Sequence, residues 1–327
     1  MESSDPPFQE FYKKLFESHA RNKNDFMILD VAEERELPMI DLGVEEEKCK
    51  MEIAKASQEW GFFQVINHGV SLDVLEKMRC EQVRLFHRPF HEKTKEGSEK
   101  FNFLAGSYQW GTPSATCLRQ LSWSEAFHVP LAGISTTDDI STLSITTKEV
   151  ATNISNLAQK IAGILAKQLG HKPNFFERDC STTSCYLRLN RYPACPISLE
   201  VFGLMPHTDS DFLTILHQDQ IGGLQLVKDG RWISIKPNPE ALIINIGDLF
   251  QAWSNNIYKS VEHRVVANKN VERFSTAYFF CPSYETMIQS CFENSVYREF
   301  SFGEFREQVQ EDVKIHGYKI GLPRFII

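Results

Sequence analysis

The sequence has no long apolar run, and this absence narrows the class of protein. A membrane-spanning helix needs about 18 or more consecutive apolar residues, and no such stretch occurs. The first residues read MESSDPPFQEFYKKLF and lack a basic segment followed by an apolar one, so we expect no secretory signal peptide. We therefore expect a soluble protein of the cytoplasm with no membrane partner.

Clustered positive charge is also missing. The chain has 35 Lys and Arg against 43 Asp and Glu, a formal net charge of −8. Because nucleic-acid binding needs a concentrated basic surface, we expect no nucleic-acid partner. The eight cysteines form no C-x-x-C pair, which favours reduced thiols and agrees with a cytoplasmic location.

The first half of the chain shows mixed helix and strand patterns. Residues 37–42 and 60–66 predict short strands, and a helix is expected to begin near Glu45 between them. Ser, Thr and Asp are frequent in 132–147, which predicts a linker. Apolar residues then recur on one helical face over 154–169, which predicts a supporting helix.

Beyond residue 181 the apolar period becomes two, which is typical of strands. The expected strands are 184–192, 213–217, 224–227, 232–235, 241–246, 260–266 and 274–280. Several short strands separated by turn signals, such as Asp229-Gly230, favour a mainly β fold with flanking helices. We expect a double-stranded β-helix, or jelly roll, braced by N-terminal helices.

The expected division places an N-terminal region at 1–131 and a catalytic core at 148–327. The catalytic strands of that core fall at about 181–282, and a helical tail follows them.

Two histidines and one carboxylate form the candidate metal site. If His207 and Asp209 lie on a strand, alternation places them on one face and turns Thr208 away. His263 lies in a β-branched segment whose pairing could bring it beside them. Two His and one carboxylate leave coordination positions open for other ligands, as in non-haem iron(II) oxygenases.

A zinc hydrolase could use the same three ligand types. It would need a general base near the bound water, and the segment shows none placed like the Glu of H-E-x-x-H. Arg273 and Ser275 again stand two apart, so a guanidinium and a hydroxyl could hold one carboxylate together. The iron interpretation gives this pair a role that the zinc interpretation does not.

A third set of polar residues alternates along one expected strand. Tyr186, Arg188, Asn190 and Tyr192 alternate there, so if Tyr192 faces the pocket, then Arg188 and Asn190 face it too. Leu187 and Leu189 would then pack outward under helices.

At this point the chain resembles the plant 2-oxoglutarate and iron(II)-dependent dioxygenases over nearly its whole length. Beside the His, Asp and Arg-x-Ser positions, the resemblance rests on the segments 60–63, 65–69, 189–196 and 222–226. It implies Fe(II), 2-oxoglutarate and O2 as cofactor and co-substrates, with ascorbate as reductant. The positions that match iron ligands are His207, Asp209 and His263, and those that match 2-oxoglutarate contacts are Tyr192, Asn190, Arg273 and Ser275.

Within that family the chain is most similar to gibberellin 2-oxidases, specifically the group that acts on C20 gibberellins. The segments 108–113, 122–128, 202–214 and 251–255 carry this resemblance, with Gln109 standing where Arg is expected. It implies 2-beta-hydroxylation, which inactivates hormone precursors. A C19 gibberellin oxidase, a flavonoid-type dioxygenase and a noncatalytic binder on the same fold remain alternatives.

A gibberellin is a rigid apolar ring system that bears carboxylate. Its pocket should therefore combine aromatic side chains with a cation or a hydroxyl donor. The candidates for substrate contact are Tyr108, Trp110, Phe127 and Arg188, with Arg119 and Arg191 in reserve.

Overall fold

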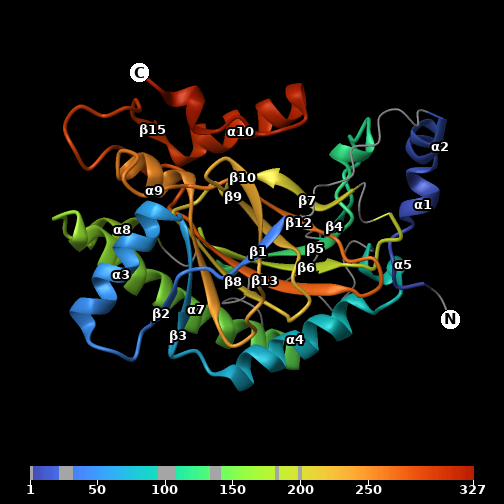
Figure 1. The fold of residues 1–327 in the computed structure, drawn as a ribbon, viewed down its shortest axis with the longest axis horizontal. Helices are drawn as coiled ribbons and strands as arrows, with labels where there is room; N and C mark the ends of the chain where they lie inside the picture. Colours follow the sequence, from blue (N-terminus) through green and yellow to red (C-terminus); the bar gives the residue numbers. More distant parts are fainter. Residues whose placement is uncertain (1–2, 22–31, 95–107, 133–140, 181–183, 198–200) are drawn as a thin grey trace.

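The centre of the molecule is a pair of β-sheets (Figure 1). The computed structural model describes residues 3–21, 32–94, 108–132, 141–180, 184–197 and 201–327. In spatial order the larger sheet contains β2 (Met39–Asp41), β3 (Phe62–Ile66), β11 (Leu242–Ile246), β8 (Leu213–Gln218), β13 (Arg273–Phe280), β6 (Tyr186–Tyr192), β5 (Glu125–Pro130) and β4 (Tyr108–Trp110).

The smaller sheet holds five strands. Their order is β1 (Glu33–Arg35), β10 (Arg231–Ile235), β9 (Leu224–Lys228), β12 (His263–Val266) and β7 (Phe202–His207). Apolar side chains of both sheets pack in one buried cluster, which includes Phe62 and Ile243 from the larger sheet and Leu226 and Ile233 from the smaller. This face-to-face packing, with helices around it, confirms the expected jelly-roll core. A short pair, β14 (Met287–Ile288) and β15 (Phe300–Ser301), stands apart from these two sheets.

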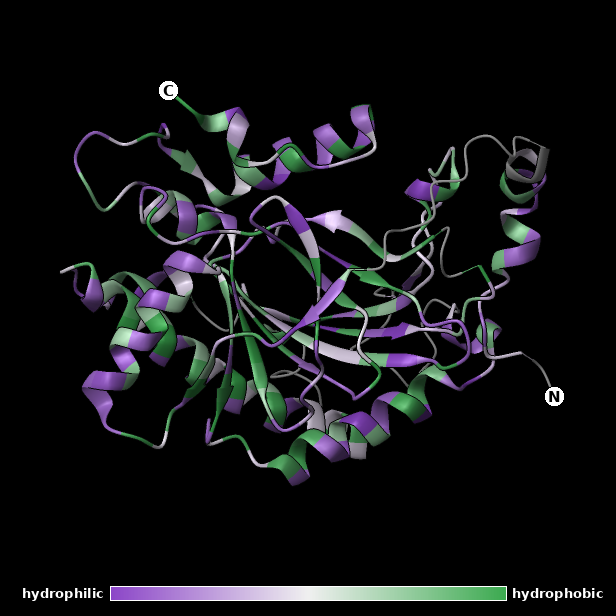
Figure 2. Ribbon diagram, in the orientation of Figure 1, coloured by the Kyte–Doolittle hydropathy of each residue, from purple (hydrophilic) through white to green (hydrophobic). Residues whose placement is uncertain are grey.

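Three helices cover the outer face of the larger sheet. They are α3 (Glu46–Glu59), α4 (Leu72–Phe86) and α7 (Thr142–Gln168), and α7 contacts both of the others. Together they contact strands β2, β3, β8 and β13. Leu187 and Leu189 of β6 are fully buried in the cluster that these helices complete, as expected. The helices carry hydrophobic and hydrophilic residues around their axes (Figure 2), so only one side of each helix joins the core.

The C-terminal helix lies on the other side of the sheets from α4 (Figure 1). This is α10 (Phe302–His316), and Gly317 ends it with φ of 80°. The remaining short helices are α1 (Phe8–Phe11), α2 (Lys13–Arg21), α5 (Phe90–Lys93), η3 (Leu118–Gln120), α8 (Asn174–Asp179), α9 (Asp248–Trp253) and η4 (Leu322–Phe325).

The expected linker over 132–147 is wrong at its C-terminal end. Helix α7 begins at Thr142, because the Ser141 side chain accepts a hydrogen bond from the Ser144 backbone N–H and caps the helix. Residues 133–140 lie outside the described part of the chain. The division into regions 1–131 and 148–327 stays a prediction.

The hairpin expected at Asp229-Gly230 joins β9 to β10, and both turn residues have positive φ, 51° and 74°. Among the described helices, none is both long enough and apolar enough to cross a bilayer. The cytoplasmic location stays a prediction.

Candidate iron and co-substrate site

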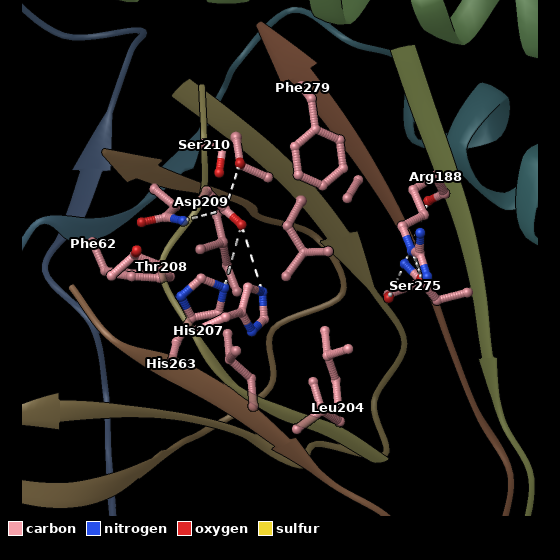
Figure 3. A pocket seen from close by; sticks show the side chains of 18 of the residues that line it. Phe62, Arg188, Leu204, His207, Thr208, Asp209, Ser210, His263, Ser275 and Phe279 are labelled. Atoms are coloured by element: carbon pink, nitrogen blue, oxygen red, sulfur yellow. Dashed lines mark hydrogen bonds and ion pairs between the residues drawn. The ribbon is translucent and has the colours of Figure 1, made fainter. Parts of the chain in front are cut away.

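The three candidate ligands converge at one end of the space between the sheets. His207 is the last residue of β7, Asp209 lies two residues later, and His263 begins β12 directly opposite His207. Their possible ligand atoms all lie within 4.8 Å of one another. The Nε2 atoms of His207 and His263 are 3.6 Å and 3.8 Å from Asp209 Oδ1, and Figure 3 shows both imidazoles directed toward this carboxylate.

The reason Asp209 points inward differs from the one expected. Strand β7 ends at His207, so strand alternation does not aim Asp209. Hydrogen bonds do this instead: the Thr214 hydroxyl donates to Asp209 Oδ2 at 2.6 Å, and the Asn245 amide donates to the same oxygen. Thr208, expected to point away, also lines the cavity, and its hydroxyl donates to Asp248.

Backbone carbonyl groups orient both imidazoles. Nδ1 of His207 lies 2.8 Å from the Met205 carbonyl, and Nδ1 of His263 lies 3.1 Å from the Val261 carbonyl. With each Nδ1–H donating outward, Nε2 is the ring nitrogen that faces Asp209 and can bind a metal. This tautomer is the one a metal ligand needs.

The charge states of His263 and Asp209 also suit a metal. Burial, and then the neighbouring His207, lower the pKa of His263 to about 4. Burial alone would raise the pKa of Asp209, but His263, His207 and the Thr214 hydroxyl together hold it well below its ordinary value. A neutral His263 imidazole and an ionised Asp209 carboxylate can therefore bind a metal without loss of a proton, and a set of two His and one carboxylate fits iron(II).

Arg273 is a buried cation with too few partners. It is 2% exposed, its Nη2 donates to Gln218 Oε1 at 2.7 Å, and its guanidinium lies 4.9 Å from the Tyr192 ring centre. Its Nε and Nη1 have no acceptor among the described residues. Because a buried, unsatisfied charged donor is costly, this position calls for an anionic ligand.

The other expected co-substrate residues surround Arg273. Strands β13 and β6 pair in a register that sets Arg273 opposite Tyr192 and Ser275 opposite Asn190. All four line one cavity of about 340 Å³ together with the three candidate metal ligands, and we call it the inner cavity. A Cβ at Gly203 would lie 2.8 Å from the Tyr192 ring, so the glycine makes room for this ring beside Arg273.

Comparison with known proteins agrees with this geometry. The family described as "2OG-Fe(II) oxygenase superfamily" matches residues 183–282, and that described as "non-haem dioxygenase in morphine synthesis N-terminal" matches residues 37–138. The chain is 60% identical to gibberellin 2-beta-dioxygenase 8 of Arabidopsis thaliana, over 98% of each chain. The chain belongs to the 2OG-Fe(II) oxygenase superfamily.

Two further known proteins are also similar to this oxygenase. It is 54% identical to gibberellin 2-beta-dioxygenase 6 of Oryza sativa subsp. japonica, over 89% of this chain and 85% of the relative. The crystal structure of JOX2 in complex with 2OG, Fe and JA matches 92% of both chains with a TM-score of 0.76 and 29% identity. The similarity therefore extends through both regions of the oxygenase rather than to the core alone.

Of the four candidate substrate residues, the inner cavity of the oxygenase contains Arg188 only. Arg306, which α10 contributes, lines the same cavity and was not identified from the sequence. A second cavity of about 740 Å³ adjoins it and shares Leu204, His207, Thr208 and Lys319 with it. We call this the outer cavity, and Arg119 lines it.

Tyr108, Trp110 and Phe127 line neither cavity. Tyr108 pairs with Phe127, which packs against Phe86 of α4 with 5.3 Å between ring centres. Directly paired residues share a face of a sheet, so both lie on the helix-covered side. Trp110 lies two residues from Tyr108 on the same face, and its ring packs 5.5 Å from that of Phe8. The structure therefore does not bring these three side chains to the inner or the outer cavity.

On the helix-covered side, Tyr108 and the reserve substrate candidate Arg191 both contact a buried carboxylate. The Tyr108 hydroxyl donates to the buried Glu125 carboxylate, which Lys93 and Arg191 also contact. Burial and the Glu125 charge raise the pKa of Tyr108 well above its ordinary value, so it remains a donor. Gln109 pairs with Ala126 on the cavity side instead, and its side chain is exposed.

Several supporting residues were not identified from the sequence, because each comes from a distant segment. Asn245 and Thr214 hold Asp209, and Gln218 holds Arg273. Lys319 donates to the Thr208 carbonyl and the Ser210 hydroxyl at 3.0 Å and 2.8 Å. No local motif marks these residues, so only the fold reveals them.

Proposed function

We propose that this oxygenase is a gibberellin 2-beta-dioxygenase that uses Fe(II), O2 and 2-oxoglutarate and acts on C20 gibberellins. The full-length similarity to two gibberellin 2-beta-dioxygenases carries the proposal. The C20 preference is the one that the sequence resemblance implies.

The proposed iron ligands are His207, Asp209 and His263. When bound, the iron supplies O2 activation coupled to the oxidative decarboxylation of 2-oxoglutarate to succinate and CO2. The protein contributes orientation: Thr214 and Asn245 fix the carboxylate, and backbone carbonyls fix both imidazoles.

The proposed co-substrate contacts are Arg273, Ser275, Tyr192 and Asn190. The Nε and Nη1 of Arg273, which have no acceptor among the described residues, leave charged donors for the distal carboxylate of 2-oxoglutarate. The Ser275 hydroxyl, which accepts from Asn190 Nδ2 at 3.4 Å, can donate to the same carboxylate. Tyr192 covers the guanidinium and shields the ion pair from water.

The gibberellin is proposed to lie between the metal ligands and the outer cavity. The inner cavity, about 340 Å³, is near the lower end of ligand sites and also holds 2-oxoglutarate, so a polycyclic substrate must extend beyond it. Leu204 borders both cavities, and Figure 3 shows Leu204 and Phe279 on the side of the inner cavity toward Arg188. Rigid placement of the ring system would select which C–H bond is oxidised.

The test is mass spectrometry of purified protein incubated with Fe(II), 2-oxoglutarate, ascorbate and either a C20 or a C19 gibberellin under ¹⁸O2. The expected result is a C20 product that has gained one labelled oxygen at carbon 2, with an equal amount of labelled succinate. Succinate without hydroxylated gibberellin would leave the oxygenase in place and overturn the hormone substrate. A product from C19 gibberellin alone would overturn the C20 preference.

A further inference from the structure

Two arginines from separate elements face the inner cavity without an acidic partner. Arg188 comes from β6 and Arg306 from α10, and both line the cavity beside Tyr186 and Phe279. Arg188 Nε donates to Asn190 Oδ1 at 3.0 Å, and within the described part of the chain neither arginine forms an ion pair.

The charges of Arg188 and Arg306 both act on His128. His128 of β5 stands directly opposite Arg188 of β6. Burial, and then the charges of Arg188 and Arg306, lower the pKa of His128 to about 4, so the imidazole is neutral and adds no charge. The His128 ring lies 4.3 Å from that of Tyr186, which stacks 4.5 Å from Phe279. An aromatic wall therefore runs beside the two guanidinium groups.

The charges that line the inner cavity do not balance. Its cationic side chains are Arg188, Arg273, Arg306 and Lys319, and Asp209 is its only acidic residue within the described ranges. Lys319 is paired with Asp248 at 2.7 Å, and the proposed function gives Arg273 to 2-oxoglutarate. Two positive charges remain, and in a partly buried space they repel each other unless an anion binds between or beside them.

We propose that Arg188 and Arg306 bind two carboxylates of one rigid, apolar substrate and so select diacids over monoacids. The inference rests on the proposed function and deepens it. C20 gibberellins that lack a lactone carry two free carboxylates, whereas in C19 gibberellins one of these acids is closed into a lactone. The arginine pair thereby supplies a physical reason for the C20 preference, and the aromatic wall receives the ring system.

The test compares Arg188→Gln, Arg306→Gln and Arg306→Lys with the wild type. For each protein, kcat/KM is measured with a C20 diacid gibberellin and with a C19 lactone gibberellin. Each Gln variant is expected to lose about 10- to 100-fold with the diacid, mainly through KM, because a charge-assisted hydrogen bond is lost. At least one Gln variant should change less than about threefold with the lactone, since a monoacid engages one guanidinium. Arg306→Lys should recover part of the diacid activity.

Equilibrium binding separates recognition from chemistry. The same two gibberellins are titrated into protein loaded with Mn(II) and 2-oxoglutarate without O2, and tryptophan fluorescence is followed. Arg178→Gln is the matched control, because Arg178 pairs with Asp179 on the surface and its side chain is 77% exposed. This variant removes the same charge and should bind like the wild type.

If the ratio of kcat/KM with the diacid to kcat/KM with the monoacid is unchanged in both Gln variants, the proposed role of Arg188 and Arg306 is overturned. If the wild type hydroxylates neither gibberellin, the proposed function fails. The binding titration then tests the proposed role of Arg188 and Arg306 independently of turnover. Diacid binding that both Gln variants lose would then support the pair. Equal binding of diacid and monoacid by the wild type would overturn it. Far-ultraviolet circular dichroism confirms that each variant is folded.

Discussion

Arg191 and Arg273 are both buried, 4% and 2% exposed, and lie on the neighbouring strands β6 and β13. They point to opposite faces of the same sheet. Arg191 lies on the helix-covered face and pairs with Glu125, Asp5 and Glu272, each at 2.7 Å. Arg273 lies on the cavity face, and its one side-chain acceptor in the described part of the chain is the neutral Gln218.

The difference separates a structural charge from a ligand-binding charge. A buried cation whose partners come from the protein holds the fold together, and its loss leaves buried acids unpaired. A buried cation with free donors is an incomplete site that a ligand completes. Burial alone therefore does not reveal the role of a charged residue, whereas its unsatisfied hydrogen bonds do.

The cavity face is tested most strongly by Asp209→Ala. Removal of the carboxylate should abolish iron binding and turnover, a loss beyond the 10- to 100-fold that follows from changing a residue around a metal ligand. Iron content after reconstitution, measured by plasma mass spectrometry, and succinate formation test this. Unchanged activity in the reconstituted variant would remove Asp209 from the metal site.

Arg191→Leu tests the helix-covered face. The change takes a partner from the fully buried Glu125, so the free energy of unfolding should fall by about 3 kcal/mol. Urea unfolding measures this, and the KM for 2-oxoglutarate should not change. In the control Arg298→Leu, a surface pair with Glu304 is lost, and the expected cost is below about 1 kcal/mol. Equal costs for the two variants would break the comparison.

Arg273→Leu should have the opposite profile. The KM for 2-oxoglutarate is expected to rise about 10- to 100-fold, because charge-assisted hydrogen bonding to the co-substrate is lost while iron is retained. The free energy of unfolding without 2-oxoglutarate should not fall, since an unsatisfied buried charge is replaced by an apolar side chain. Succinate formation against 2-oxoglutarate concentration, with iron content in parallel, measures both. A normal 2-oxoglutarate requirement would contradict the co-substrate role.

The smallest effect is expected for Tyr108→Phe. The variant loses one hydrogen bond to Glu125 and keeps the ring, so the free energy of unfolding should fall by about 1 kcal/mol. The KM for gibberellin should match that of the wild type, because the ring lies on the helix-covered face. A severalfold rise in this KM would place Tyr108 at the substrate after all.

The sequence predicted the strands whose apolar residues alternate and are rich in β-branched side chains. The segment of β13 illustrates this, since its period of two sets Arg273 and Ser275 on one face. Strand β7 lacked this signal because it contains Gly203 and Pro206 and no β-branched residue. The positions of His207 and Asp209 could be identified, but the hydrogen bonds that aim Asp209 could not.

The face on which a strand residue lies was the main limit for the substrate pocket. A period of two shows that Tyr108 and Trp110 share a face, but not which face is covered by helices. That choice depends on the pairing of Tyr108 with Phe127, which no local pattern encodes. Arg306 could not be identified from the sequence for a related reason. An arginine on an amphipathic helix resembles any solvated residue until the position of the helix in the fold is known.

Lys319 connects the segment after α10 to residues 208–210, which include the proposed iron ligand Asp209. Its ammonium group bonds the Thr208 backbone carbonyl, the Ser210 hydroxyl and the Asp248 carboxylate, and so grips the residues on both sides of Asp209. A protease that cut after Tyr318, which is 62% exposed, would release this grip without touching a ligand. Loss of the residues from Lys319 onward is therefore expected to weaken iron retention although every proposed ligand is kept.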